Sequence, residues 1–438
     1  MIPDIFMKRV QEDGEWSLFQ PTVLPELEDT YGARYEQIYT QAEKDGKAWK
    51  TLPARKIFNT ILESQIETGT PYILFRDTIN KHNNQTAMIR QSNLCCEIME
   101  VTSSTETAVC TLASICLPKS IQGGRFSFEH LRKIVDVVIT NLNKTIDRSD
   151  YPVHKAKYSH KKRRPIGLGV QGLSDTFQRL SLAVGSPEAL AFDAKVFETI
   201  YLQAVTTSNR LAKESCHYDT FGDSPMAKGL FQFDLYDKEI PLNYPEEWES
   251  LREQVKEHGL RNSLLCALMP TASSAQIFGN SESFETRSSN AYVRRTLSGE
   301  YIVVNPVLYE RREWTESMAQ NMLANRGSVQ QMPELTPHEK KVFRTVFEIS
   351  MKEHITHAAV RQPFICQSQS MNLHFAEPTK KKLTSALFYA WKQGLKTGCY
   401  YLRRQVKNNM MGTIVKESST QEEKKAACVD DVCVMCSS

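Results

Sequence analysis

The chain has 438 residues, and its 54 Lys and Arg nearly balance its 51 Asp and Glu, which leaves a formal net charge of +3. A charge this small excludes the strong basic field that attracts nucleic acid or an acidic membrane surface. No stretch approaches the roughly 18 consecutive apolar residues of a membrane helix. The first residues also lack the pattern of a secretory signal, so we expect a cytoplasmic protein that binds neither nucleic acid nor membrane.

The length allows a large core, built either as two or more ordinary domains or as one large barrel with appendages. Apolar residues at helical spacing predict helices in three segments, residues 131–142, 196–211 and 342–349. Three short apolar runs have the length of buried strands, residues 264–269, 301–304 and 364–366. Strands of this length alternating with long helices favour an α/β architecture with a largely parallel sheet.

The last part of the chain differs in composition from the rest. From about Lys416 it is polar and unable to bury a core, which predicts a flexible tail. Near its end, Cys433 and Cys436 form a Cys-x-x-Cys pair. A structural zinc site commonly uses two such pairs, and the sequence holds no second one, so we predict a redox-active dithiol and no metal site.

Asn93, Cys95 and Glu97 alternate along one short run. On an extended backbone these three side chains project to the same side and converge on one small ligand. A thiol can carry a radical, a carboxylate can take a proton, and an amide can orient a hydroxyl group. The pattern alone also fits an edge strand with a buried cysteine and a solvated glutamate, so on these residues both interpretations stay open.

Residues 270–274, Pro-Thr-Ala-Ser-Ser, follow an apolar run and precede a predicted helix start. Backbone N–H groups and hydroxyls at such a place form an anion site, because they meet the positive end of the helix dipole. The alternative is an ordinary helix cap by Thr271 or Ser273. Residues 167–172 match Gly-x-Gly-x-x-Gly but follow a basic run rather than a long buried strand, so we interpret these glycines as packing room instead of a dinucleotide site.

Seven blocks carry a resemblance to a known family. The run from Asn93 to Glu97 resembles the Asn-Leu-Cys-x-Glu finger loop of class I ribonucleotide reductase large subunits. Six further blocks resemble the eukaryotic-type members in the same order along the chain, at residues 1–9, 109–114, 164–172, 270–274, 367–370 and 391–398. The resemblance covers nearly the whole chain and weakens at residues 230–252 and after Asn408.

The resemblance implies a fold and an activity. Residues 1–410 are expected to form the C-terminal portion of a ten-stranded α/β barrel, with a finger loop near residues 92–97, and residues 411–438 a redox-shuttle tail. The expected reaction is the reduction of ribonucleoside diphosphates to deoxyribonucleoside diphosphates by a thiyl radical, which supplies DNA precursors.

Roles follow residue by residue from the matching motifs. Cys95 matches the cysteine that becomes the thiyl radical in that family. Glu97 matches the base at the ribose 3′ hydroxyl, and Asn93 matches the amide that holds the sugar. Cys110 matches one member of the active-site dithiol, although the residues alone fit one more buried thiol. The remaining assignments are substrate diphosphate binding by Thr271, Ala272, Ser273 and Ser274, radical transfer by Tyr400 and Tyr401, and exchange with thioredoxin or glutaredoxin by Cys433 and Cys436.

The resemblance also implies partners. This chain is expected to bind no cofactor of its own, because the radical comes from a di-metal small subunit. The family's large subunit continues upstream of the segment that matches Met1, and that region holds sites for ATP and deoxynucleotide effectors and the second active-site cysteine. A homodimer is expected for the full-length form. The alternative is an inactive truncated homologue that binds the small subunit.

Overall fold

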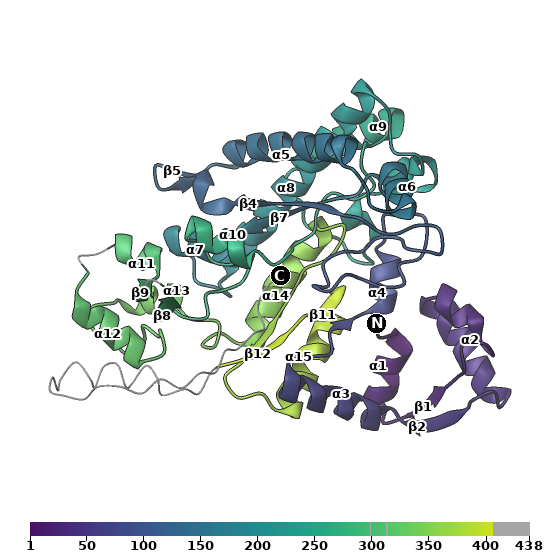
Figure 1. Cartoon of the computed structure of the whole chain (residues 1–438), viewed down its shortest axis with the longest axis horizontal. Helices are drawn as coiled ribbons and strands as arrows, with labels where there is room; N and C mark the ends of the chain where they lie inside the picture. The colour runs from purple at the N-terminus through teal and green to yellow at the C-terminus, as the bar shows by residue number, and fades with distance from the viewer. Residues whose placement is uncertain (298, 312–313, 406–438) are drawn as a thin grey trace.

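The computed structural model describes residues 1–297, 299–311 and 314–405, and it has the predicted mixed α/β architecture (Figure 1). The predicted boundary after residue 410 and the tail that follows it lie outside these residues. The helices are α1 (Asp4–Gln11), α2 (Gly32–Lys44), α3 (Ala54–Thr68), α4 (Arg76–Lys81), α5 (Phe128–Arg148), α6 (His154–Arg163), α7 (Leu173–Arg179), α8 (Pro187–Glu214), α9 (Pro245–His258), α10 (Ala272–Phe278), α11 (Pro306–Glu310), α12 (Glu316–Ala324), α13 (Pro337–Val342), α14 (Met351–Arg361) and α15 (Lys380–Lys392).

The strands are short and pair across long stretches of sequence. They are β1 (Glu15–Leu18), β2 (Lys50–Pro53), β3 (Ile73–Leu74), β4 (Thr111–Cys116), β5 (Ile121–Gln122), β6 (Arg125–Phe126), β7 (Ile166–Gln171), β8 (Ala291–Thr296), β9 (Gly299–Val304), β10 (Leu373–Phe375), β11 (Thr397–Cys399) and β12 (Leu402–Arg404). β4 runs parallel to β7 over six residue pairs. Parallel bridges from Leu168 to Cys266 and from Leu268 to Gln369 extend this ladder by two further segments. The run at residues 264–269 is therefore buried beside β7, as its pattern predicts, but it makes isolated bridges and not a full strand.

Two long helices cover this parallel ladder. α5 contacts β4 and β7 with the apolar stripe that the sequence predicts, and Leu131, Val135 and Leu142 are buried. α8 packs against α5, and Val196, Ile200 and Ala204 of its predicted stripe are buried, whereas Leu211 is half-buried. Ser127 caps α5 by accepting a hydrogen bond from the amide of His130, which fixes the start of the helix. None of the helices in the described residues combines the length and apolar character that a membrane span requires.

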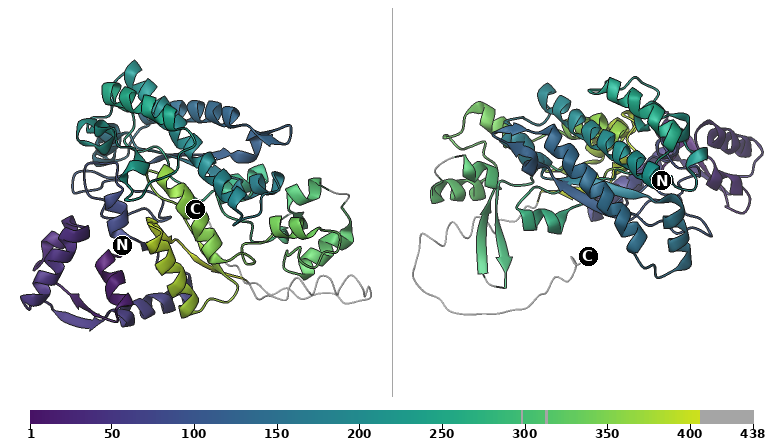
Figure 2. Two further views of the ribbon diagram at one scale, coloured as in Figure 1. Left: turned by 180° about the vertical axis from the view of Figure 1, so that it is seen from behind. Right: turned by 90° about the horizontal axis from the view of Figure 1, so that it is seen from above.

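A second, smaller core lies at the end of the molecule opposite α1 to α3 (Figure 1). It is built from the residues between β8 and α13, and its centre includes Leu308, Met322 and Phe343. The β8–β9 hairpin extends away from the main body, as Figure 2 shows from a second side. The main core and this smaller core are joined by the chain that enters β8 and leaves α13.

Three element predictions are wrong in part. Residues 301–304 form a strand in an exposed hairpin and not a buried strand, because Tyr301 is 51% exposed and Ile302 borders an open hollow. Residues 364–366 are buried but do not form a strand, since Pro363 sets a 3₁₀ turn there and provides no N–H for a sheet. The predicted helix over residues 342–349 ends at Val342.

The interrupted helix has a local cause. The Glu348 carboxylate accepts hydrogen bonds from the amide and the hydroxyl of Thr345, at 2.7 and 3.0 Å. Ser350 then begins α14 in a capping box with Glu353. Side-chain bonds of this kind compete with helical backbone bonds, so a helix stops and a new one starts although the buried apolar residues keep their spacing.

The glycines of β7 provide packing room, as the sequence analysis proposes. A Cβ atom on Gly169 would lie 2.8 Å from the carbonyl oxygen of Ala267 and 2.7 Å from the sulfur of Met269. The neighbouring strand segment therefore approaches β7 as closely as it does only because residue 169 has no side chain.

We expect Gly169→Ala to lower the free energy of unfolding by about 1–3 kcal/mol, because the added methyl group overpacks a buried strand against backbone. Urea denaturation followed by circular dichroism measures this loss. Gly222→Ala is the matched control, since a Cβ there meets nothing within 4 Å. Equal stabilities of the two variants would contradict the packing role.

Candidate active site

The loop at residues 92–97 is a turn and not the extended run that the sequence analysis assumes. The amide of Cys96 donates to the carbonyl of Asn93 at 3.3 Å, and Cys96 has a φ of 68°. A left-handed residue with a side chain is uncommon and costs about 1–2 kcal/mol. Burial of the Cys96 side chain and a 2.8 Å hydrogen bond from the Thr397 hydroxyl to its carbonyl hold this conformation. The edge-strand interpretation of this run is therefore wrong.

The segment at residues 367–370 anchors this loop. The amide of Ser368 donates to the carbonyl of Glu97 at 2.9 Å, and the Ser370 hydroxyl donates to the Glu97 carboxylate at 3.0 Å. The Gln367 side chain accepts from the amide of Met99 at 2.9 Å. All three anchoring residues are buried, so the loop is fixed by protein and not by solvent.

The side chains of Glu97 and Asn93 are hydrogen-bonded to each other, although a turn and not an extended backbone brings them together. The Glu97 side chain is buried, which raises the pKa of its carboxyl, while hydrogen bonds from Asn93 and Ser370 partly offset this rise. Asn93 is exposed, and its side-chain oxygen also accepts from the amide of Ile98 at 3.2 Å. The structure thus brings a buried carboxyl and an accessible amide together.

The Cys95 thiol lies half-buried between Glu97 and Tyr400. Burial is the main cause that raises the pKa of this thiol, and the charge of Glu97 raises it further. The Tyr400 hydroxyl, which donates to the sulfur at 3.2 Å, acts in the opposite direction. Cys95 is therefore held as a protonated thiol near neutral pH, which suits hydrogen-atom chemistry better than nucleophilic attack.

Tyr400 belongs to a cluster of three tyrosine rings. The rings of Tyr400 and Tyr401 have centroids 4.4 Å apart, and the ring of Tyr72 lies 5.1 Å from each. The Tyr72 hydroxyl donates to the Tyr401 hydroxyl at 2.8 Å. A continuous path of contacts therefore runs from Tyr401 through Tyr400 to the Cys95 sulfur.

Cys110 lies at the start of β4 and is half-buried. Its sulfur accepts from the side-chain amide of Gln367 at 3.4 Å, and burial raises the pKa of the thiol well above its ordinary value. Since Gln367 also binds the amide of Met99, one buried side chain connects Cys110 to the chain that leaves the finger loop.

The residues assigned to the substrate diphosphate open α10. Thr271 is buried at the N-cap position, but its hydroxyl accepts from the amide of Ser283 at 2.7 Å and does not cap the helix. Ala272 and Ser273 are exposed, and Ser274 donates to the carbonyl of Thr271 at 3.3 Å. The capping alternative is therefore wrong for Thr271, and the exposed start of this helix stays open to a ligand.

The α10 loop and the anchor of Glu97 share one edge of the sheet. Leu268 and Gln369 are paired in parallel, so residues 270–274 and Ser370 each follow the carboxyl end of a neighbouring segment. Ligands commonly bind at the carboxyl ends of parallel strands. The structure therefore places the predicted anion loop and the predicted base at the same edge.

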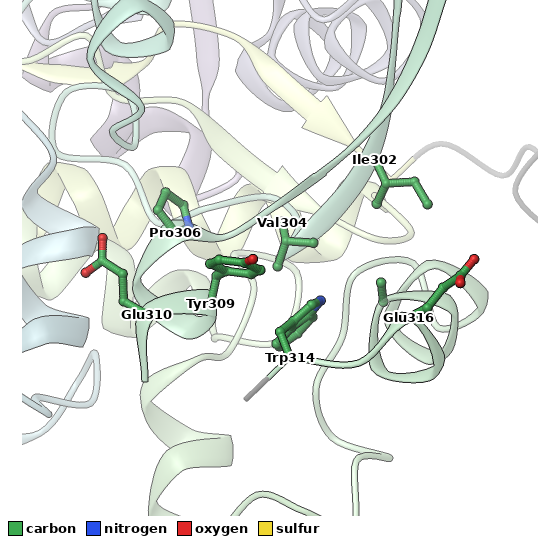
Figure 3. Close-up of a pocket in the computed structure, with 8 residues that line it drawn as sticks. Ile302, Val304, Pro306, Tyr309, Glu310, Trp314 and Glu316 are labelled. Carbon is green, nitrogen blue, oxygen red and sulfur yellow. The ribbon is translucent and has the colours of Figure 1, made fainter. Parts of the chain in front are cut away.

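Two hollows lie elsewhere on the surface of the described residues. A hollow of about 430 Å³ lies on the smaller core and is lined by Ile302, Val304, Pro306, Tyr309, Glu310, Trp314, Glu316 and Ala319 (Figure 3). It contains none of the predicted site residues, and neither does a hollow of about 600 Å³ beside α2 and α4. Over residues 1–297, 299–311 and 314–405, no three His, Cys, Asp or Glu side chains are grouped to hold a metal ion.

Sequence reasoning missed four residues of the site. Gln367 and Ser370 lie in a block that the resemblance includes, but nothing in the local pattern indicates that their side chains anchor another loop. Tyr72 lies 329 residues from its hydrogen-bond partner Tyr401 and has no local signal. Glu100 resembles an ordinary surface residue in sequence, yet it is 3% exposed. Cys433 and Cys436 lie outside the described residues.

Comparison with known proteins identifies the family. The model for the ribonucleotide reductase barrel domain matches residues 1–401. The chain is 45% identical to ribonucleoside-diphosphate reductase large chain 2 of Saccharomyces cerevisiae, over 98% of this chain and 51% of that protein. The large subunits of Danio rerio and vaccinia virus are 43% and 45% identical over the whole chain, which covers 58% and 57% of their lengths. The chain therefore belongs to the ribonucleotide reductase family and spans somewhat over half the length of these relatives.

We expect Glu97→Gln and Tyr400→Phe to change the reactivity of Cys95 in opposite directions. The first removes a charge that raises the pKa of the thiol, so alkylation of Cys95 at pH 8 should become faster. The second removes a hydrogen bond that lowers this pKa, so alkylation should become slower. Mass spectrometry of the Cys95 peptide measures both rates, and a change of the same sign in both variants would refute this arrangement.

Proposed function

We propose that this chain carries the active-site part of a ribonucleoside-diphosphate reductase large subunit, which forms deoxyribonucleoside diphosphates by thiyl-radical chemistry. One observation carries the proposal, the 3.2 Å contact between the Tyr400 hydroxyl and the Cys95 sulfur beside a buried carboxyl. Family membership supports it, because the matched relatives bear the name of this enzyme.

The first step is a hydrogen-atom transfer between Tyr400 and Cys95. A phenoxyl radical on Tyr400 takes the hydrogen atom of the Cys95 thiol, which restores the phenol and leaves a thiyl radical on sulfur. The 3.2 Å contact suits this transfer, because the hydroxyl oxygen already meets the sulfur. Tyr401, whose ring centroid lies 4.4 Å from that of Tyr400, passes the radical from the small subunit.

The thiyl radical on Cys95 then takes the hydrogen atom from the ribose C3′. Glu97 accepts the proton of the 3′ hydroxyl, and its raised pKa brings it closer to neutral pH, where a general base works best. Asn93 orients the sugar from the exposed side of the same turn. The 2′ hydroxyl leaves as water, and a hydrogen takes its place on C2′. The two electrons for this reduction come from Cys110 and a second thiol, which become a disulfide.

The substrate diphosphate binds at the start of α10. Ala272, Ser273 and Ser274 supply backbone amides and hydroxyls there, and Thr271 fixes the loop through Ser283. The carboxyl edge of the sheet brings this loop beside the anchor of Glu97, so one nucleotide can reach both.

The partners follow from the same reaction. The chain binds no cofactor of its own, and a di-metal small subunit supplies the radical. Cys433 and Cys436 exchange electrons with the active-site disulfide and are reduced by thioredoxin or glutaredoxin. ATP and deoxynucleotides act as effectors on the full-length form, which is a homodimer in the cytoplasm.

We expect Cys95→Ser to abolish the reduction of nucleoside diphosphates when the chain is co-expressed with an upstream segment and a small subunit, because a serine O–H is too strong a bond to form the radical. Cys216→Ser is the matched control, since this exposed cysteine has no part in the site. Product formation is measured by chromatography of the deoxynucleotides. Unchanged turnover in the Cys95 variant would overturn the proposal, and small-subunit binding with no nucleotide affinity would favour the binding-module alternative.

The tail dithiol has a separate test. We expect the double variant Cys433→Ser, Cys436→Ser to lose turnover supported by thioredoxin but to keep turnover driven by dithiothreitol, because a small dithiol reaches the active-site disulfide directly. Steady-state rates with each reductant distinguish the two routes. Equal losses with both reductants would reject the shuttle.

A further inference from the structure

Glu100 is a buried carboxylic acid to which the reaction above gives no role. It is 3% exposed, and its Oε1 atom has no hydrogen-bond partner among the residues that the structure describes. A buried carboxylate without a cation is costly, so such a group requires a physical explanation. Glu100 lies three residues after Glu97, on the chain that leaves the finger loop.

The Glu100 carboxyl faces the Cys110 thiol. Burial raises the pKa of this carboxyl, and hydrogen bonding by the Cys110 thiol and by the amide of Val109 partly offsets this rise. The Cys110 sulfur also accepts a hydrogen bond from the side-chain amide of Gln367 at 3.4 Å. Gln367 gives a hydrogen bond to the sulfur, which leaves the S–H group to donate toward Glu100.

The surroundings hold this pair in place. A Cβ atom on Gly167 would come within 3.1 Å of the Cys110 sulfur, so the absence of a side chain there makes room for the thiol. The oxygen of the Gln367 carboxamide accepts a hydrogen bond from the amide of Met99, the residue before Glu100, at 2.9 Å. Apart from the pair itself, the ionisable group that acts on Cys110 is Glu97, which is negative when charged.

Burial raises the pKa of Glu100 to about 7, and burial together with the charge of Glu100 raises the pKa of Cys110 well above its ordinary value. Two acids that interact this strongly titrate as one unit, with two macroscopic steps that belong to the pair. Near neutral pH the pair therefore moves between a form with two protons and a form with one.

We propose that Glu100 is the proton acceptor and donor of Cys110: its carboxylate takes the thiol proton when this sulfur enters the active-site disulfide, and returns it when the disulfide is reduced. The proposal deepens the proposed function, because it rests on Cys110 as one of the two reducing thiols.

Atoms and electrons balance in both directions. On oxidation the S–H bond of Cys110 breaks and its proton joins the Glu100 carboxylate, while the second thiol also loses its proton and an S–S bond forms between the two sulfurs. The two electrons pass to the substrate with two protons, one from the second thiol and one from water, so that the 2′ hydroxyl leaves as water and C2′ gains a hydrogen. On reduction by a dithiol, the S–S bond breaks and Cys110 leaves as a thiolate. The Glu100 carboxylic acid then protonates this thiolate, while the dithiol becomes a disulfide and gives one of its protons to the second thiol and the other to water.

The pH dependence of Cys110 alkylation tests the proton exchange directly. Below pH 7 the logarithm of the rate in the wild-type chain should rise with a slope of one. Above about pH 7 the rate should level off. The reactive form, a thiolate beside a carboxylic acid, then holds as many protons as the dominant form, so its share of the molecules no longer depends on pH. Iodoacetamide labelling of the full chain, quantified on the Cys110 peptide, gives this profile.

Glu100→Gln should remove the break and leave a slope of one through pH 7. One pH unit above the break, the variant should therefore react about tenfold faster than the wild type. Cys216 in the same samples is an internal control, since it is exposed and its rate should be equal in both chains. A merely structural role of Glu100 would change rates at all pH values and would not remove the break.

A wild-type profile with no break near pH 7, or a break that persists in Glu100→Gln, would overturn the proposal. If the variant unfolds, the buried Cys266 and Cys399 become reactive, and the wild-type profile then decides alone. The labelling reads the Glu100–Cys110 pair and not turnover. Its failure is therefore distinguishable from failure of the proposed function, which the Cys95→Ser variant tests.

Discussion

The candidate site depends on the hydrogen bonds of one buried side chain, Gln367. Its carboxamide accepts from the amide of Met99 and donates to the Cys110 sulfur and to the carbonyl of Ile166. A fully buried amide that satisfies three partners is costly to replace, because each partner left alone loses about 1–3 kcal/mol. Through this residue the finger loop, the start of β4 and the start of β7 are fixed to one another.

Burial without neutralising cations is the second constraint on the site. It raises the pKa of Cys95, Glu97, Glu100 and Cys110 alike. The thiols therefore stay protonated, and the carboxyls approach the range in which they exchange protons near neutral pH. A site of this kind favours the transfer of hydrogen atoms and protons over attack by a thiolate, in agreement with the chemistry proposed for the family motif.

The parts of the fold that were predictable from sequence are those governed by local periodicity. The stripe that includes Leu131 and Val135 determines the face of α5 that is buried, and the structure confirms it. The same reasoning failed at Ile302, because whether an apolar strand is covered depends on distant elements, and at Val346, because Glu348 and Ser350 interrupt a helix through side-chain bonds.

The site was predictable in its residue types but not in its geometry. The order of motifs indicated Cys95, Glu97 and Tyr400, and the structure brings these residues together. The left-handed Cys96, the partner Tyr72 and the buried Glu100 depend on contacts between segments far apart in sequence. No local pattern encodes such contacts, which explains why an extended backbone was expected where a turn exists.

The central claim is that the Tyr400 hydroxyl delivers the radical to the Cys95 sulfur, and turnover of Tyr400→Phe tests it most directly. The variant is assayed with an upstream segment and a small subunit, beside Tyr389→Phe, whose hydroxyl shares a 3.0 Å hydrogen bond with the hydroxyl of Thr356. The account predicts that Tyr400→Phe forms no deoxynucleotide while it keeps the melting temperature of the wild type, and that Tyr389→Phe stays active. Turnover of Tyr400→Phe near the wild-type rate would contradict the account.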